Sequence, residues 1–329
     1  MAVIGAGGWG TALAVHLARV GHQTYLWGRD AAMVASIQAA RCNATYLPDV
    51  PFPDDLIVTG DLGLALDATD FIVSAVPSHG TRAVLRDAAS HIHATAVVVS
   101  ATKGLEQGSL FRPTEVIAQE LGPGVRSAVL SGPSFASEVA RQLPTAMSVA
   151  SRDPDVVETV QAEFRAPYLR LYGTPDVIGV ELGGALKNVI AIAAGVAEGL
   201  ELGHNALAGL VTRGLAEMSR LACAAGAEKE TLTGLAGLGD LVLTCTGRLS
   251  RNRHVGVELA HGRPLDAVLG GMRMVAEGVR TTDAALALAA RYDVELPIAS
   301  RVAAVLAGRQ SPRAALGELM LRPQRAEVG

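Results

Sequence analysis

Aromatic residues and cysteines are scarce in this chain of 329 residues. Aromatic side chains make up 4% of the sequence although half of it is hydrophobic, so we expect cores built mainly from aliphatic side chains. The three cysteines, Cys42, Cys223 and Cys245, are widely spaced and odd in number, which argues against a disulfide framework and against a zinc site. No activating residue accompanies Cys245, so we interpret it as a packing residue.

Long runs of one charge and long apolar runs are also missing. The formal net charge is −4 and no basic run occurs, which argues against nucleic-acid binding. No apolar run reaches the roughly 18–20 residues that a membrane span requires. The first apolar run begins at residue 2, which leaves no room for a signal peptide, so we expect a cytoplasmic protein. The eight histidines lack metal-ligand spacing, and we expect solvated histidines and no metal site.

A glycine-rich turn near the start of the chain is the strongest positive signal. Gly5 permits a tight reversal, Gly7 lets a pyrophosphate approach the backbone, and Gly10 lets a helix pack close to a strand. The N–H groups of that helix would face the phosphates. The turn lies between predicted strands at residues 2–4 and 24–27 and opens a predicted helix at residues 11–20, as in a dinucleotide-binding βαβ unit.

The residues after the second strand bear on which dinucleotide binds. A carboxylate there usually binds the ribose 2′-hydroxyl of NAD, whereas an arginine can bind the 2′-phosphate of NADP. Arg29 comes before Asp30 and carries donors suited to phosphate, so we favour NADPH, with NADH possible. In the alternative interpretation, Arg29 is a solvated loop cation and Asp30 caps a helix that starts at Ala31.

The chain is long enough for two cores, and its pattern of predicted secondary structure changes near Pro175. Strands alternate with helices up to about residue 173, which predicts a doubly wound, largely parallel sheet. Beyond Pro175 the periodic segments read as helices. We therefore expect an α/β protein with an N-terminal doubly wound Rossmann-type domain at residues 1–175 and a C-terminal all-helical domain at residues 176–329. The join is short, so the domains should form a cleft. Helices are expected at residues 181–199, 207–225, 253–261, 264–269, 282–292, 297–307 and 311–320.

Two buried strands should deliver polar residues to the edge of the sheet where ligands bind. The strand at residues 71–76 ends at Pro77-Ser78-His79, and the strand at residues 96–100 ends just before Lys103. Lys103 would then be a cation at the mouth of the cofactor site. Any surface lysine after a strand could give the same pattern.

Lys187 lies on a predicted helix that otherwise looks buried. Gly183 and Gly184, one turn earlier, leave the near side of the lysine almost without side chains. Glycine costs about 1 kcal/mol relative to alanine inside a helix, and an unpaired buried charge is costly. We interpret the glycine pair as room for a flat nicotinamide and a small substrate beside a functional lysine. The alternative is a lysine that reaches solvent from a helix end.

Two further groups could act on a substrate. Asp240 lies among glycines and apolar residues and needs a partner, such as a lysine ammonium or a substrate hydroxyl; otherwise it caps the segment that follows. Ser250, Arg251 and Asn252 immediately precede the helix predicted at residues 253–261. Hydroxyl, guanidinium, carboxamide and helix N–H groups together make a phosphate cradle, although the same residues could form an ordinary cap on a surface helix.

Eight segments, in order, carry a resemblance to a known family. They are GAGGWGTALA (5–14), LPDVPFP (47–53), ATKGLE (101–106), SGPSFA (131–136), LGGALKNVIAI (182–192), TRGLAEMSRL (212–221), GLAGLGDLVLTCT (234–246) and SRNR (250–253). Together they resemble the bacterial NAD(P)-dependent glycerol-3-phosphate dehydrogenases over nearly the whole chain. The resemblance implies a cytoplasmic homodimeric enzyme that interconverts sn-glycerol 3-phosphate and dihydroxyacetone phosphate by hydride transfer with NAD(P)H. Its product would supply glycerophospholipid synthesis.

The resemblance also implies roles for residues. It makes Lys187 the proton acceptor. To Gly5, Gly7 and Gly10 of the turn it adds cofactor positions at Gly8, Trp9, Arg29, Tyr46, Lys103, Ala136, Arg251, Val275 and Glu277. It places Lys103, Gly132, Ser134, Lys187, Asp240, Ser250, Arg251 and Asn252 around the substrate. The chain departs from its counterparts at Gly8, where a serine is common, and at residues 203–210, which are more apolar.

The expected mechanism requires a neutral Lys187 that takes the proton of the substrate's C2 hydroxyl while hydride leaves for the nicotinamide. Burial and repulsion from Lys103 would lower the lysine pKa from about 10.4, while Asp240 would oppose them. One alternative is another two-domain dehydrogenase with a lysine base, acting on a 2-ketoacid or 3-hydroxyacid without a phosphate cradle. The other is a dinucleotide-sensing regulatory protein, which would have no reason to bury Lys187.

Overall fold

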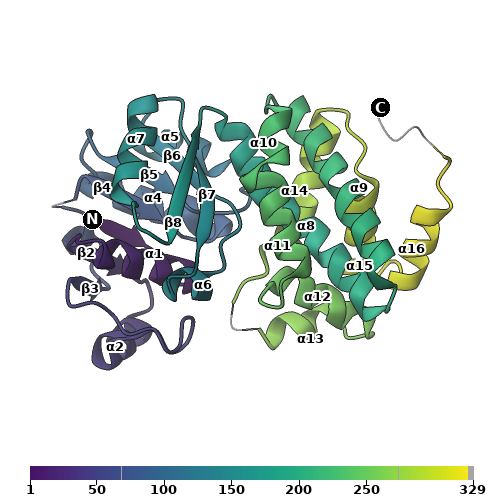
Figure 1. Cartoon of the computed structure of the whole chain (residues 1–329), viewed down its shortest axis with the longest axis horizontal. Helices are drawn as coiled ribbons and strands as arrows, with labels where there is room; N and C mark the ends of the chain where they lie inside the picture. Colours follow the sequence, from purple (N-terminus) through teal and green to yellow (C-terminus); the bar gives the residue numbers. More distant parts are fainter. Residues whose placement is uncertain (68, 273, 325–329) are drawn as a thin grey trace.

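The computed structural model describes residues 1–67, 69–272 and 274–324, which form two lobes side by side (Figure 1). The N-terminal lobe contains one eight-stranded sheet in the order β3-β2-β1-β4-β5-β6-β7-β8. Its strands are β1 (Ala2–Ile4), β2 (Thr24–Trp27), β3 (Leu56–Thr59), β4 (Phe71–Ser74), β5 (Val97–Ser100), β6 (Arg126–Ser131), β7 (Thr145–Ala150) and β8 (Leu169–Thr174). The predicted α/β class and Rossmann-type lobe are confirmed.

Helices cover both faces of the sheet, because successive side chains of each buried strand point to opposite sides. Val3 joins the core under α1, α2 and α7, whereas Ala2 and Ile4 join the core under α3, α4 and α5. The helices of this lobe are α1 (Gly8–Arg19), α2 (Ala31–Ala40), α3 (Leu62–Leu66), α4 (Ser78–Ala88), α5 (Pro113–Leu121), α6 (Ala136–Ala140) and α7 (Pro154–Glu163). Both cores are aliphatic for the most part.

The sheet is parallel except between β6 and β7, which run antiparallel. A parallel pairing needs a crossover of a dozen or more residues, usually a helix that returns the chain along the sheet. Helix α6 has only five residues and is too short for that return. Strand β8 follows the longer α7 and pairs parallel with β7.

The described residues of the C-terminal lobe form helices and connecting loops without a strand, with α8 (Val177–Gly199) at the centre. Around α8 lie α9 (Gly203–Ala224), α10 (Lys229–Thr233), a π-helical turn (Leu235–Gly239), α11 (Asp240–Thr246), α12 (Arg251–Ala260), α13 (Leu265–Gly270), α14 (Glu277–Arg291), α15 (Pro297–Leu306) and α16 (Pro312–Met320). The lobes meet in an apolar cluster that joins Val129 and Ala150 of the sheet to Val180 of α8.

Several predicted helix boundaries were wrong in the same direction. Helix α9 starts four residues before its predicted start at residue 207, and α14 starts five residues before residue 282. Helices α10 and α11 and the π-helical turn between them were not predicted at all. Glycine and other weak helix formers dominate these turns, so tertiary packing rather than local preference makes them helical.

Helix α8 is long and apolar enough to cross a membrane by length and composition, but 89% of its most apolar 18-residue window is buried inside the protein, so this helix is buried as expected. One expectation about burial, at His16, was wrong. His16 is buried rather than solvated. Its Nε2 lies 3.1 Å from the carbonyl of Phe164, which can only accept, so Nδ1 accepts from the Tyr168 hydroxyl at 2.8 Å.

Candidate active site

The glycine turn has the geometry that its sequence predicts. Gly5 has φ +111, in the region that favours glycine, and a Cβ there would lie 2.9 Å from the carbonyl oxygen of Ala75. A Cβ on Gly10 would lie 1.9 Å from the Gly5 oxygen, so the close approach of α1 to β1 requires glycine. A Cβ on Gly7 would meet nothing within 4 Å, which leaves the backbone open to a ligand.

The surroundings of this turn fit the pyrophosphate of a dinucleotide. No side chain caps the start of α1, so its first N–H groups remain available to an anion. The indole Nε1 of Trp9 is buried without a hydrogen-bond partner. A Cβ on Gly8 would lie 3.0 Å from the Tyr46 carbonyl oxygen and 3.7 Å from Met274 Sδ, so segments of both lobes border the turn. Ala136 begins α6, whose Ala140 carbonyl accepts from Arg19 of α1.

The side chains of Arg29 and Asp30, at the end of β2, differ in their contacts. The Asp30 carboxylate caps α2 and accepts from the backbone N–H of Met33 at 3.0 Å. Arg29 is exposed, and within the described residues no hydrogen bond or ion pair holds its guanidinium. The cap that was considered for Asp30 is therefore present, and Arg29 stays available to an anion.

A carboxylate bridges two lysines where the lobes meet. Asp240, the first residue of α11, is 1% exposed, and its carboxylate accepts from Lys187 of α8 and, at 2.6 Å, from Lys103 after β5. Lys187 is 5% exposed and also donates to the Thr244 hydroxyl at 2.7 Å. The predicted partner of Asp240 is thus a lysine ammonium, and the alternative of a solvent-seeking Lys187 is wrong.

Burial makes Lys187 a weak base poised near neutrality. Desolvation is the largest effect and lowers the pKa of Lys187 to about 7, Asp240 opposes it, and Lys103 adds to the lowering. These are the directions that the sequence predicts. Burial also raises the pKa of the Cys245 thiol to about 12, which agrees with a packing residue.

The glycine pair before Lys187 does not leave room for a ligand, so that interpretation was wrong. A Cβ on Gly183 would lie 2.7 Å from the Ala236 carbonyl oxygen of the π-helical turn. A Cβ on Gly184 would lie 2.6 Å from the Ser131 hydroxyl at the end of β6. The missing side chains let α8 approach two other parts of the protein, and this approach positions Lys187 beside the sheet.

Gly132 and Ser134, which the resemblance assigns to the substrate, lie in the turn that contacts Lys103. The Gly132 carbonyl accepts from Lys103 Nζ at 2.9 Å and from the Ser134 hydroxyl at 3.0 Å. Gly132 has φ +136, and a Cβ there would lie 3.0 Å from Met147 Cα. The turn after β6 therefore presents its carbonyl to Lys103 instead of a side chain.

Ser250 precedes α12, whereas Arg251 and Asn252 form the first turn of this helix, which therefore starts two residues before its predicted start at residue 253. Ser250 caps α12 by accepting from the Arg253 N–H at 3.2 Å. The Asn252 carboxamide is buried, donates to the Asn188 side chain at 2.9 Å and accepts from the Gly278 N–H. Arg251 is left as the side chain that can bind an anion.

Arg251 is exposed at the start of α12 and has Glu277 as its electrostatic neighbour. Desolvation by the surrounding protein lowers the pKa of Arg251, while Glu277 opposes this effect. The Glu277 carboxylate accepts from the Ser78 hydroxyl at 2.8 Å and from its N–H at 3.3 Å, which ties α14 to the start of α4. Val275 is exposed just before α14.

Sequence reasoning missed three residues that hold this site together. Thr244 is one helical turn after Asp240 in α11. A prediction of this helix would have placed Thr244 beside Asp240, because residues four apart lie on the same face. Asn188 follows Lys187 directly and supports Asn252. Ser78 was noted at the sheet edge, but its contact with Glu277 joins residues 199 positions apart and has no local signal.

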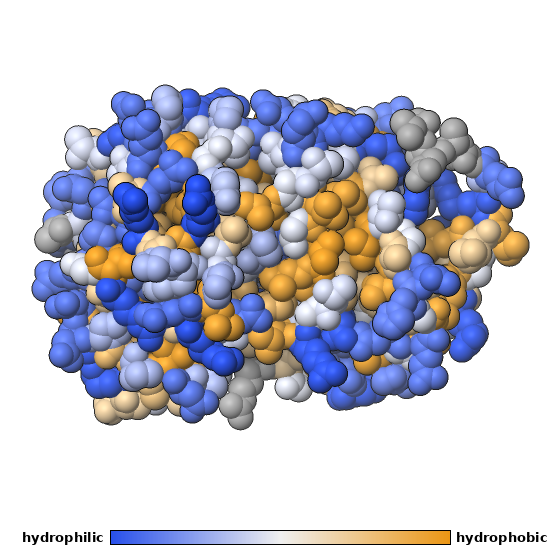
Figure 2. All heavy atoms as spheres, in the orientation of Figure 1, coloured by the Kyte–Doolittle hydropathy of each residue, from blue (hydrophilic) through white to orange (hydrophobic). Residues whose placement is uncertain are grey.

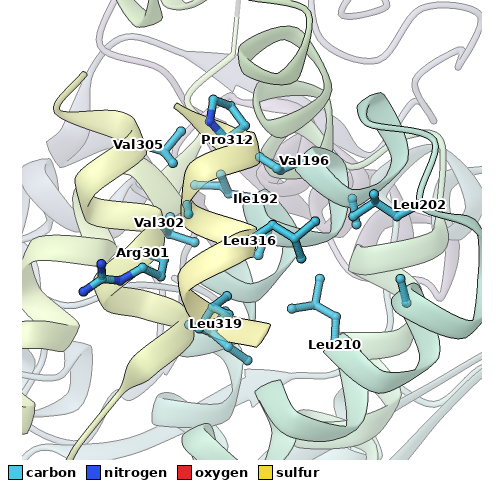
Figure 3. Close-up of a pocket in the computed structure, with 15 residues that line it drawn as sticks. Ile192, Val196, Leu202, Leu210, Arg301, Val302, Val305, Pro312, Leu316 and Leu319 are labelled. Carbon is cyan, nitrogen blue, oxygen red and sulfur yellow. The ribbon is translucent and has the colours of Figure 1, made fainter. Parts of the chain in front are cut away.

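A hollow elsewhere in the helical lobe lacks the features of an active site (Figure 3). It lies between the C-terminal half of α8, the start of α9, and helices α15 and α16. Its lining is apolar apart from Arg301, which is paired with Glu318. Binding sites combine apolar walls with convergent polar groups, and the described residues bring such groups together around Lys187 rather than at this hollow.

A dinucleotide-binding turn in one lobe and a buried lysine–aspartate pair where the two lobes meet are the features of a nicotinamide-dependent dehydrogenase. The chain belongs to the NAD-dependent glycerol-3-phosphate dehydrogenase family: the model of that family's N-terminus matches residues 1–157 and the model of its C-terminus matches residues 176–317. The resemblance found in the sequence is confirmed.

Relatives and a solved structure match the chain over its full length. It is 53% identical to glycerol-3-phosphate dehydrogenase (NAD(P)+) of Koribacter versatilis, covering 100% of this chain and 98% of that protein. It is 51% identical to the protein of the same name from Thioalkalivibrio sulfidiphilus, covering 99% and 98%. The crystal structure of glycerol-3-phosphate dehydrogenase from Coxiella burnetii is 43% identical with a TM-score of 0.94 and covers 98% of both chains.

Proposed function

We propose that the chain is an NAD(P)-dependent glycerol-3-phosphate dehydrogenase that interconverts sn-glycerol 3-phosphate and dihydroxyacetone phosphate, an activity of the EC 1.1.1.94 type. Full-length relatives of this name support the assignment. The observation that carries it is Lys187, a buried lysine with a pKa lowered to about 7, held by Asp240 at the carboxyl edge of a dinucleotide-binding sheet. A regulatory protein would gain nothing from this costly arrangement.

In the oxidative direction, Lys187 as neutral amine takes the proton of the C2 hydroxyl, and in the reductive direction its ammonium returns that proton to the ketone oxygen. Bound nicotinamide supplies the hydride chemistry. Asp240 and Thr244 orient the lysine. Arg251 binds the substrate phosphate at the first turn of α12 and so fixes the reacting carbon. The remaining substrate positions are Lys103, Gly132, Ser134, Ser250 and Asn252, with Asn252 acting through Asn188.

For the cofactor, we infer that NADPH is preferred and NADH is accepted. Asp30 is used as a helix cap, whereas Arg29 is exposed and suited to a 2′-phosphate. The pyrophosphate would lie on Gly7, Gly8 and Trp9. The other cofactor positions are Gly5, Gly10, Tyr46, Lys103, Ala136, Arg251, Val275 and Glu277.

We also propose a cytoplasmic homodimer that supplies glycerophospholipid synthesis, with the domain boundary between residues 175 and 176. Hydrophobic residues gather on the face of the helical lobe that Figure 2 presents. Leu238, Val242 and Leu249, on and beside α11, are exposed large hydrophobic side chains, and such groups often mark a protein interface. Light scattering of the full chain measures its mass, and a Leu249→Glu variant should shift a dimer towards the monomer.

The test of the activity is the absorbance change at 340 nm with dihydroxyacetone phosphate, run with NADPH and NADH in parallel. Lys187→Ala should abolish turnover while the affinity for NADPH, measured by fluorescence titration, stays within about a few-fold, since the amine acts on the substrate proton. Turnover of a 2-ketoacid without inhibition by phosphate would instead support the other two-domain reductases. Near wild-type turnover by the variant would refute the role of Lys187.

A further inference from the structure

The N-terminal end of α14 crosses the edge of the sheet where the cofactor turn lies. Met274 approaches Gly8 at one side, and Glu277 accepts both hydrogen bonds from Ser78 at the other. Gly104 makes room for this contact, because a Cβ there would lie 2.9 Å from Ser78 Oγ and 3.2 Å from Glu277 Oε2. A segment of the helical lobe is thereby fixed over the carboxyl ends of β1 and β4.

This contact brings two basic residues together that have no part in the mechanism above. Arg280 is one turn after Glu277 and shares its face of α14, and His79 follows Ser78 in the first turn of α4. Both are exposed. Among the described residues, no side chain forms a hydrogen bond or ion pair with either of them.

Arg29 comes to the same edge from the neighbouring side. Strands β2 and β4 flank β1 in parallel, so the residues that follow them lie at one end of the sheet. The pKa of His79 is lowered, first by partial burial and then by the positive charge of Arg280. Arg29 also lowers this pKa, whereas Glu277 raises it, so all three charged side chains lie close enough to act on the His79 ring. Two unpaired guanidinium groups and a histidine ring with N–H donor capacity, brought together from three elements, indicate an anionic ligand.

We propose that His79 and Arg280 complete, together with Arg29, the binding site for the 2′-phosphate on the adenosine of NADPH. The proposal rests on the NADPH preference inferred above. The pyrophosphate already has the first turn of α1, so the anion left for this cluster is the ribose phosphate, which belongs at the end of β2. Arg280 adds a second guanidinium to Arg29, and the His79 ring adds an N–H donor.

The test compares 2′,5′-ADP with 5′-AMP, which differ by the 2′-phosphate, by calorimetric titration of the full chain. Arg280→Met should raise the Kd for 2′,5′-ADP about tenfold and leave the Kd for 5′-AMP within about twofold, as expected for a lost charge-assisted contact. His79→Gln should raise the first value about threefold. Arg291→Met is the matched control on the same helix, roughly 16 Å further along, and should change neither value.

The outcomes distinguish the proposed roles of His79 and Arg280 from the NADPH preference on which they rest. Wild-type protein that binds the two nucleotides equally would remove the NADPH preference, and the cluster's role with it. The wild-type protein could prefer 2′,5′-ADP to 5′-AMP and lose this preference in Arg29→Ala but keep it in Arg280→Met and His79→Gln. That result would overturn the roles of Arg280 and His79 and leave the NADPH preference standing. Equal weakening of both nucleotides by Arg280→Met would also overturn it, because the contact would then be to the shared part of the nucleotide.

Discussion

Replacing Asp240 by asparagine should move the pH dependence of ketone reduction to lower pH. The carboxylate of Asp240 accepts from Lys187 and, at 2.6 Å, from Lys103, and it is almost completely buried. Its charge raises the pKa of Lys187 against the larger effect of desolvation, and the balance leaves that pKa at about 7. The Asp240→Asn variant keeps the shape of the side chain but removes the charge that favours the ammonium.

The size of the shift follows from the contact. An opposite charge at this distance changes a pKa by about 1–3 units, so the pKa of Lys187 should fall from about 7 to roughly 4–6. Reduction requires the ammonium as acid. At pH 7 about half of the wild-type enzyme carries it, but at most about one tenth of the variant does, which lowers kcat/KM for dihydroxyacetone phosphate at least about fivefold. Below the new pKa, the loss should shrink.

The assay follows kcat/KM for reduction from pH 5 to 9 at saturating NADPH, and records the pH at which the rate begins to fall. Asp176→Asn is the matched control, because Asp176 is also a buried carboxylate and caps the same α8 by accepting from the Gly179 N–H at 2.8 Å. It lies roughly 16 Å from Lys187 along the helix. If Asp240→Asn shifted the falling limb no further than this control, or shifted it upward, the electrostatic reasoning would be refuted.

Four further variants test other parts of the structure. Arg29→Ala should raise KM for NADPH more than KM for NADH in steady-state assays, and equal shifts would remove its 2′-phosphate role. Gly10→Ala should destabilise the protein by at least about 2 kcal/mol in urea unfolding, because its Cβ would lie 1.9 Å from the Gly5 oxygen. Gly7→Ala, where no atom lies within 4 Å, should keep stability but weaken NADPH binding. Burial lowers the pKa of His16 from 6.5 to about 4, so between these values the unfolded chain binds one proton more than the folded protein. The free energy of unfolding should therefore decrease by about 3 kcal/mol as the pH falls from 6.5 to 4. A His16→Gln variant should lose this pH dependence.

The parts of the fold that local sequence determines could be predicted. The strands of the sheet follow from short apolar runs, and the glycine turn from the steric needs of Gly5 and Gly10. The direction of β7 could not be predicted, because it depends on the length of α6 and not on the residues of the strand. The same holds for α11, whose helical turns begin in a glycine-rich segment that local preference disfavours.

For the candidate site, the need of a buried charge for a partner could be predicted from the sequence, whereas the contacts of the glycine pair could not. A buried aspartate requires a partner, so the sequence indicated a lysine ammonium or a substrate hydroxyl for Asp240, and the structure shows that the partner is Lys187. The purpose of Gly184 could not be read in the same way, since a missing side chain looks alike whether a ligand or a strand approaches it. Only the fold shows that the Ser131 hydroxyl fills the space.

The position of Lys103 makes the basicity of the active site a property of both lobes. Lys187 and Asp240 belong to the helical lobe, whereas Lys103 follows β5 of the sheet, yet Lys103 contacts Asp240 and lowers the pKa of Lys187. Separation of the lobes would remove this repulsion and admit water, and both changes would raise the lysine pKa towards its ordinary value. With the lobes apart, Lys187 would therefore be protonated and could not accept a proton from the substrate. The amine becomes competent to accept a proton only where the residues that bind the cofactor and those that bind the substrate are in contact.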